Sequence, residues 1–366
     1  MRKFNCLVLA SLGFLACSSP DDSKSLHQDA GIDVIATPSS STASPGISSS
    51  CTGGSSSSSS SSSGGRWSGG FGGLGSGGGD AGLDAPDDGS IVPPSGSFDI
   101  LEPDPGPIVY WGGQVMTQPI NVYFIWYGSW TTPTATILED MIRNIAASPW
   151  FQINTEYYQV DDTGSKTFAA KQVNFAGSSY VGYLYGHTLY NPELFNIMSN
   201  AFNNNIVPMD KNAQYFILPS KDVTYYDVFS KGCDNMCGFH RADQFGEVSI
   251  KYAVIGDPMA CPTNCTALSS YNKYGFTTTP NIDPSADGMS GIMLHELSEM
   301  ITDPDPYNDV SWRDSSGLET ADLCSWVYSD LYLTPNGSIG NVHIGNKDFL
   351  IQENWVLSKQ TCGLHL

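Results

Sequence analysis

Basic residues are scarce in this sequence of 366 residues. Lysine and arginine together number 16, against 37 aspartate and glutamate residues, so the formal net charge is −21. A negative field of this size repels nucleic acids and anionic lipids, and it attracts divalent cations or basic ligands. The composition therefore argues against nucleic acid as a partner and favours a ligand of positive charge.

Long apolar runs and two common catalytic motifs are also missing. Only residues 7–15 form an apolar stretch near the start, and that stretch is too short to span a bilayer as a mature helix. The sequence contains no Gly-x-Ser-x-Gly elbow and no glycine loop of the kind that cradles phosphates. The glycines instead concentrate in one low-complexity region.

The N-terminus resembles a bacterial lipoprotein signal. Two basic residues precede the apolar stretch, which ends in Phe14-Leu-Ala-Cys17, similar to a lipobox. In such signals the peptide is cut before the cysteine, which then carries the lipid. We therefore expect a signal peptide at 1–16, a membrane anchor at Cys17 and, because Ser18 follows, an outer-membrane location. An ordinary secretory signal is the alternative.

The next segment, 17–95, has the composition of a flexible tether. Serine fills 55–63, glycine dominates 64–79, and apolar surface is too sparse to offset the entropy of an ordered chain. From residue 96 the sequence becomes rich in aromatic and β-branched residues. We expect residues 96–366 to form one globular domain. The sequence does not indicate its oligomeric state.

Six cysteines fall in this globular part, an even number that in an exported protein predicts three disulfides. The sequence does not fix their pairing. We favour pairing neighbours, and a four-thiolate zinc site made by the two Cys-x-x-x-Cys segments is the alternative. The favoured pairs are Cys233–Cys237, Cys261–Cys265 and Cys324–Cys362.

Hydrophobic periodicity predicts an α/β domain with a mixed central sheet. Runs of β-branched and aromatic residues alternate with segments whose apolar residues recur at helical spacing. Proline marks the start of two helices, after Thr132 and Asn191, and is expected to stop the first of these at Pro149 and the last predicted helix at Pro304. The predicted strands cover 120–127, 167–175, 214–219, 249–255 and 349–356, and the predicted helices begin at 132, 191 and 288.

The last predicted helix carries the motif His295-Glu-Leu-Ser-Glu299, which differs by one residue type from the His-Glu-x-x-His of zinc hydrolases. Residues four apart share a helix face, so His295 and Glu299 can hold one metal ion while Glu296 acts as general base. The motif is short and also occurs by chance in ordinary helices.

A third metal ligand must come from outside this helix. Glu319 and Asp322 are the candidates, and they share a face if their segment is helical. His240, next to Cys237, is a candidate ligand, proton donor or transition-state stabiliser, or else a packed core histidine. Zinc is the favoured metal, although a second carboxylate ligand keeps manganese and calcium open. Further acids, Asp303, Asp305, Asp309 and Asp314, crowd the intervening loop.

The ordered motifs of this chain resemble the EXORDIUM family, also called phosphate-induced protein 1. The resemblance covers residues 108–366 and rests on the order and cysteine spacing of the segments Tyr110–Ile120, Val122–Trp130, Asp222–Thr224, Cys233–His240, Cys261–Cys265, Asp287–Met289, His295–Glu299 and Glu319–Cys324. It implies an extracellular domain associated with the cell surface, and it places the six core cysteines and all six candidate site residues in a shared pattern. It implies no particular reaction. The tether and lipobox are foreign to the plant members.

Two functions follow from these residues. The first is a surface-tethered metal-dependent hydrolase, a peptidase or amidase. The second is a non-enzymatic domain that binds a glycan, peptide or wall component, with a structural calcium or no metal. Aromatics between Tyr157 and Tyr190 either line a ligand groove or, as we favour, belong to the core.

Overall fold

The structure is a computed structural model that describes residues 107–228, 230–267 and 277–366. The expected signal peptide, the tether and Cys17 lie outside the described residues. Within these ranges the chain has the expected α/β organisation around a mixed central sheet.

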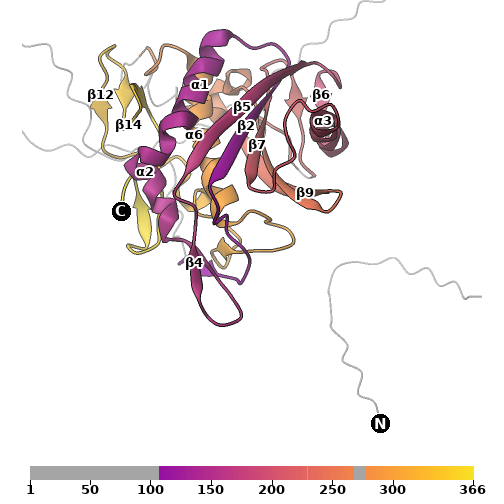
Figure 1. Cartoon of the computed structure of the whole chain (residues 1–366). Helices are drawn as coiled ribbons and strands as arrows, with labels where there is room; N and C mark the ends of the chain where they lie inside the picture. Colours follow the sequence, from indigo (N-terminus) through magenta and orange to yellow (C-terminus); the bar gives the residue numbers. More distant parts are fainter. Residues whose placement is uncertain (1–106, 229, 268–276) are drawn as a thin grey trace, which may run out of the picture. The chain divides into compact units, whose positions relative to one another are not determined.

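The central sheet has five strands in the order β5-β2-β7-β10-β9 (Figure 1). Within the sheet, strands β5, β2, β7 and β10 run parallel to one another, and the edge strand β9 is antiparallel to β10. The bounds are β2 Ile120–Tyr127, β5 Val173–Gly182, β7 Ala213–Pro219, β9 Gly238–Phe245 and β10 Val248–Ile255.

Helices cover both faces of this sheet. Alternate residues of β2 enter two separate cores, with Phe124 and Trp126 in one and Ile125 and Tyr127 in the other. The first core includes the apolar faces of α1 (Thr132–Asn144) and α6 (Pro284–Thr302), and the second includes that of α3 (Asn191–Asn203). Burial on both faces explains why β2 is continuously apolar instead of alternating with polar residues.

Two predicted strands are each divided in the structure, so the prediction of continuous strands was wrong there. Residues 167–175 contribute to β4 (Lys166–Phe168) and β5, and 349–356 contribute to β15 (Lys347–Phe349) and β16 (Asn354–Val356). Each piece pairs with a different neighbour: β4 with β3 (Tyr158–Val160), β15 with β14 (Val342–Ile344) and β16 with β17 (Thr361–Gly363). Such pairing is not visible in apolar periodicity.

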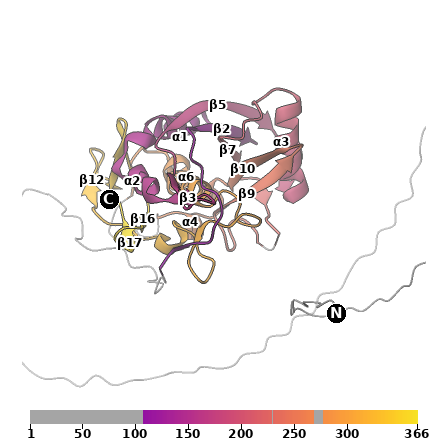
Figure 2. The same cartoon turned by 60° about the horizontal axis from the view of Figure 1, so that its bottom comes forward.

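Short elements complete the domain. Figure 2 shows β12, β16 and β17 gathered near the C-terminus. The small paired strands are β1 (Val109–Tyr110) with β11 (Trp312–Arg313), β6 (Thr188–Leu189) with β8 (Thr224–Tyr225), and β12 (Tyr332–Leu333) with β13 (Ile339–Gly340). The short helices are η1 (Ile145–Ala147), α2 (Pro149–Gln152), η2 (Ile153–Glu156), η3 (Pro258–Ala260), α4 (Pro262–Cys265) and η4 (Asp322–Cys324).

Helix α6 begins one turn earlier than the sequence prediction because Asp283 caps it. The Asp283 side chain accepts a hydrogen bond from the Ala286 amide, and Pro284 occupies the first turn. The helix ends at Thr302, as expected from Pro304, which disfavours a helical conformation in the residue before it. Almost all of its last two turns is buried, which makes α6 the rigid support for the motif residues.

Three disulfides form, as the sequence predicted, but two of the three favoured pairs were wrong. Cys233 pairs with Cys261 and Cys237 with Cys265, whereas Cys324–Cys362 is confirmed. The two Cys-x-x-x-Cys segments have the same spacing and lie side by side, so each cysteine bonds its counterpart in the other segment. These bridges leave no thiolates there for the alternative four-cysteine zinc site.

The aromatics between Tyr157 and Tyr190 do not act as one group. Tyr157 is fully buried in the core, as favoured, but Tyr180 and Tyr183 are 55% and 38% exposed. Tyr180 stacks on Trp126, and Tyr183 stacks on His187. The core interpretation therefore holds for Tyr157 and was wrong for the two exposed rings.

Candidate metal centre

The structure brings all six predicted site residues together. Helix α6 supplies the three motif residues, edge strand β9 supplies His240, and the segment at the start of η4 supplies Glu319 and Asp322. Segments far apart in the sequence therefore converge because α6 packs against the β9–β10 side of the sheet.

His295, Glu299 and Asp322 form the first group that can hold a metal ion. His295 Nε2 lies 3.1 Å from Glu299 Oε1 and 3.4 Å from Asp322 Oδ1. Two ligands bound at roughly 2.0–2.1 Å in a tetrahedral arrangement lie roughly 3.4 Å apart, so this spacing suits one zinc ion. By distance, Asp322 is the third member of the group around His295.

His240, Glu299 and Glu319 form a second group on the other side of Glu299. His240 Nδ1 lies 3.6 Å from Glu299 Oε2, and His240 Nε2 lies 3.6 Å from Glu319 Oε1. One ligand atom of each residue lies within 4.8 Å of the other two, as is also true of the first group. His240 is only 6% exposed, so it reaches the centre from inside the protein.

Glu296 sits beside both groups without belonging to either. Its Oε2 atom lies 3.3 Å from His240 Nδ1, and the residue is 4% exposed. An added Cβ on Gly238 would lie 2.8 Å from Glu296 Oε1, so the absent side chain at Gly238 leaves room for this carboxylate. The Glu296 side chain is therefore held in one place by His240 and by the backbone of β9.

Burial and mutual attraction shift the pKa values of Glu296, Glu299, Glu319 and the two histidines. Burial raises the pKa of Glu296, and it raises that of Glu319 well above its usual range. Glu299 is also buried, but the attraction of His295 and the hydrogen bond from His240 outweigh burial and lower its pKa. Burial opposes charge on both histidines, yet Glu319 raises the pKa of His240 well above its usual value, and Glu299 does the same for His295. The cluster thus attracts positive charge.

Two polar partners that the sequence analysis did not identify complete the centre. Arg313 Nε donates to Asp303 Oδ2 at 2.6 Å, and Arg313 Nη2 lies 3.7 Å from Glu319 Oε2. Gln352 Nε2 lies 2.9 Å from His295 Nδ1 and donates to the Ala321 carbonyl. Arg313 could have been identified as the single basic residue among the acids between residues 303 and 322. Gln352 carries no such signal.

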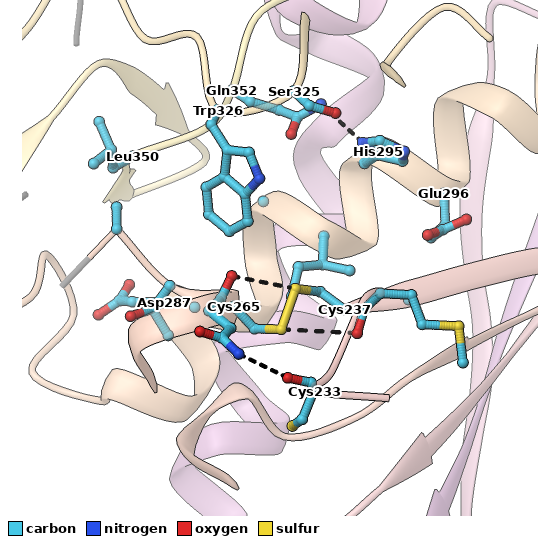
Figure 3. Close-up of a pocket in the computed structure, with 18 of the residues that line it drawn as sticks. Cys233, Cys237, Cys265, Asp287, His295, Glu296, Ser325, Trp326, Leu350 and Gln352 are labelled. Atoms are coloured by element: carbon cyan, nitrogen blue, oxygen red, sulfur yellow. Dashed lines mark hydrogen bonds between the residues drawn. A yellow bond between two sulfur atoms is a disulfide. The ribbon is translucent and has the colours of Figure 1, made fainter. Parts of the chain in front are cut away.

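A pocket of about 420 Å³ opens along one face of α6 and ends at the candidate metal-ligand cluster (Figure 3). His295, Glu296 and Asp322 lie at that end. Gly288 and Gly291 also line the pocket, and because they have no side chains they leave space beside the helix. Across the pocket, Trp326 extends toward α6 (Figure 3). Other lining residues come from the disulfide-linked segments and from the chain before β16: Cys233, Asn235, Met236, Cys237, Asn264, Cys265, Leu350 and Gln352.

The loop acids lie outside the candidate centre, apart from Asp303. Two histidines away from the centre, His187 and His343, are exposed and pair with Asp222 and Asp348. The loop acids Asp305, Asp309 and Asp314 accept hydrogen bonds from backbone amides, so they shape the loop. Asp303 is fully buried and orients Arg313, and its carbonyl oxygen lies 3.2 Å from His240 Nε2.

The family model described as the phosphate-induced protein 1 conserved region matches residues 108–362. The chain belongs to this family. It is 28% identical over 281 residues to Protein EXORDIUM-like 5 of Arabidopsis thaliana, covering 69% of this chain and 75% of that protein. It is 23% identical over 252 residues to Protein PHOSPHATE-INDUCED 1 of Nicotiana tabacum, covering 63% and 75%. No solved structure matches the chain.

Family membership and the three disulfides indicate an extracellular domain, because disulfides persist in oxidising compartments. Among the helices within the described ranges, none is both long enough and apolar enough to cross a bilayer.

Proposed function

We propose that this extracellular domain is a metal-dependent hydrolase that cleaves peptide or other amide bonds. The observation that carries the proposal is the convergence of His295 Nε2, Glu299 Oε1 and Asp322 Oδ1 at the end of a pocket. A buried carboxylate, Glu296, lies beside the same spot. Three protein ligands next to an accessible space are the arrangement of a catalytic zinc site, whereas structural sites are closed by four ligands.

The donor set fits zinc better than calcium. One imidazole and two carboxylates are too few for the six to eight oxygen ligands that calcium takes, and histidine is a ligand typical of zinc. Manganese remains compatible with the two carboxylates. When bound, the metal would supply an activated water and polarise the substrate carbonyl.

Within this scheme Glu296 is the general base. Burial raises the pKa of Glu296 above its usual value, the direction that makes a carboxylate a stronger base. His240 Nδ1 keeps the Glu296 carboxylate in place, so His240 supports catalysis by positioning Glu296. Gln352 has the same effect on His295 through the other ring nitrogen.

The pocket would receive the substrate chain. Its walls combine the apolar side chains of Ile292, Leu350 and Trp326 with the polar groups of Asn235 and Asn264. A mixed lining with few charged groups away from the metal end suits a peptide or an amide-linked wall component.

The proposal is tested with the purified full chain, loaded with zinc, and a peptide library together with cell-wall fragments. Products are identified by mass spectrometry. Glu296→Gln should lower cleavage by several orders of magnitude while leaving metal content and thermal stability unchanged, because it removes only the proton acceptor. Glu247→Gln, a change in the turn between β9 and β10, is the matched control.

Cleavage that Glu296→Gln leaves intact would rule out the assignment. Stoichiometric zinc without cleavage of any substrate would favour the second function, a binding domain in which the pocket holds a glycan, peptide or wall component.

We further propose that the domain is held at a bacterial outer membrane by a lipid on Cys17. The support is the resemblance of residues 14–17 to a lipobox and the long serine- and glycine-rich segment that follows. In a bacterial host, labelled palmitate should be incorporated into the wild-type chain and not into Cys17→Ala, which should be recovered in soluble fractions. Equal membrane recovery of both proteins would contradict the anchor.

A further inference from the structure

Glu319 has a buried oxygen that no protein donor satisfies. Its Oε2 atom faces Arg313 Nη2 at 3.7 Å. Among the described residues Oε1 has no hydrogen-bond partner, and His240 Nε2 faces it from 3.6 Å, beyond hydrogen-bond distance. The residue is only 8% exposed. An ionised carboxylate oxygen without a hydrogen bond in the interior is costly, so this atom marks a place where a bound cation, or else a proton on His240, would be stabilised.

Glu299 connects that place to the proposed metal centre. Its Oε1 atom lies 3.1 Å from His295 Nε2, and its Oε2 atom lies 3.6 Å from His240 Nδ1. Each oxygen therefore faces a different imidazole, and Oε1 also accepts a hydrogen bond from the Asp322 amide. A carboxylate whose two oxygens each lie beside a different group of candidate metal ligands is placed to bridge two metal ions.

The charges of the cluster also call for more than one cation. Glu296, Glu299, Asp303, Glu319 and Asp322 supply five carboxylates, and Arg313 is the one permanently charged base within contact distance of the described cluster. Histidines that bind a metal are neutral and carboxylates that bind one are ionised, so in the metal-loaded centre the excess would be four negative charges, which a single divalent ion would halve and two would balance. Buried charges persist only when they are paired in this way.

We propose a second divalent-cation site formed by His240, Glu299 and Glu319, which shares Glu299 with the first site. The inference extends the proposed function, because two ions held by one bridging carboxylate form the clamp used by many two-metal hydrolases. The Asp303 carbonyl, 3.2 Å from His240 Nε2, is an additional oxygen beside this site. The rival occupant is a proton on His240.

The metal content of the full chain separates these alternatives without any assay of activity. Protein stripped with a chelator is titrated with zinc alone and examined by native mass spectrometry. We expect two zinc ions per wild-type chain. Glu319→Gln, nearly identical in shape, should bind one, and Asp322→Asn should weaken the other site while leaving the second. His187→Ala, which breaks an exposed histidine–aspartate pair, is the control and should retain two.

A second readout tests the bridge itself. With manganese in place of zinc, electron paramagnetic resonance should show spin coupling between two ions in the wild-type chain, and the Glu319→Gln spectrum should be that of one isolated ion. One zinc per wild-type chain, lost in Asp322→Asn and kept in Glu319→Gln, would overturn the second site and leave the proposed hydrolase intact. No bound zinc at all would overturn both.

Discussion

At the scale of single residues, Glu299 determines what the centre can do. It is the one residue common to both groups of metal-ligand candidates, and it stays ionised although buried, because two imidazoles face it. At the position where a His-Glu-x-x-His motif has its second histidine, Glu299 faces one imidazole with each of its two oxygens.

A titration prediction at this scale concerns Asp257, which lies away from the centre. Asp257 is 6% exposed and accepts hydrogen bonds from the Met259 amide and the Ser285 hydroxyl. Burial raises its pKa, with Asp283 adding to the shift and Lys221 opposing it. The folded state therefore holds this proton more tightly than the unfolded state, so the stability that it contributes is present at low pH. That stability is lost as the pH rises through the folded pKa.

Asp257→Asn removes this titration while keeping the cap at Met259. Relative to wild type, the variant should gain unfolding free energy as the pH rises from about 4, the unfolded value for aspartate. Denaturant unfolding at a series of pH values measures the difference. A difference that does not change with pH would show that Asp257 does not titrate as described.

At the scale of elements, two glycines on α6 differ in the space available for a side chain. A Cβ on Gly288 would lie 2.7 Å from Pro258 Cγ, whereas a Cβ on Gly291 would meet only the Leu350 carbonyl at 4.0 Å. Gly291→Ala should stabilise the fold by about 0.5–1 kcal/mol through helix propensity. Gly288→Ala should destabilise it by about 1–3 kcal/mol through overpacking. Thermal and denaturant unfolding of the pair measure both signs, and equal effects would contradict the packing described for η3 and α6.

The elements also show what sequence reasoning could and could not reach. Strand β2 and helices α1, α3 and α6 were predictable, because their apolar residues and their prolines act locally. The extents of β4, β5, β15 and β16 were misjudged because each strand ends where its own pairing ends, with β3, β2, β14 and β17 respectively. The disulfides Cys233–Cys261 and Cys237–Cys265 depend on two segments lying side by side, which spacing alone cannot reveal.

At the site, the six predicted residues lie close together in the structure. Three of them were predictable from the helical spacing of the motif, and the other three from the family pattern. Which of the two residues, Asp322 or Glu319, faces which histidine was not predictable. Glu319 lies in the segment before η4 and faces His240, whereas Asp322, the first residue of η4, faces His295. Arg313 and Gln352 approach from β11 and from the chain before β16, and only the folded chain shows these contacts.

At the scale of the whole molecule, the net negative charge and the buried carboxylate cluster both favour the binding of cations. The chain carries a net charge of −21, and a field of that sign raises the local concentration of divalent cations near the surface. The pocket then connects the surface to a cluster of buried carboxylates that is stable only with positive charge beside it. The central claim is therefore the location of a metal ion.

The most direct test is an anomalous-scattering map at the zinc edge from crystals of the protein grown with zinc. The account predicts a strong peak in contact with His295 Nε2, Glu299 Oε1 and Asp322 Oδ1, beside the pocket and absent in crystals of Glu299→Gln. Crystals with zinc at other positions and no peak among these three atoms would contradict it.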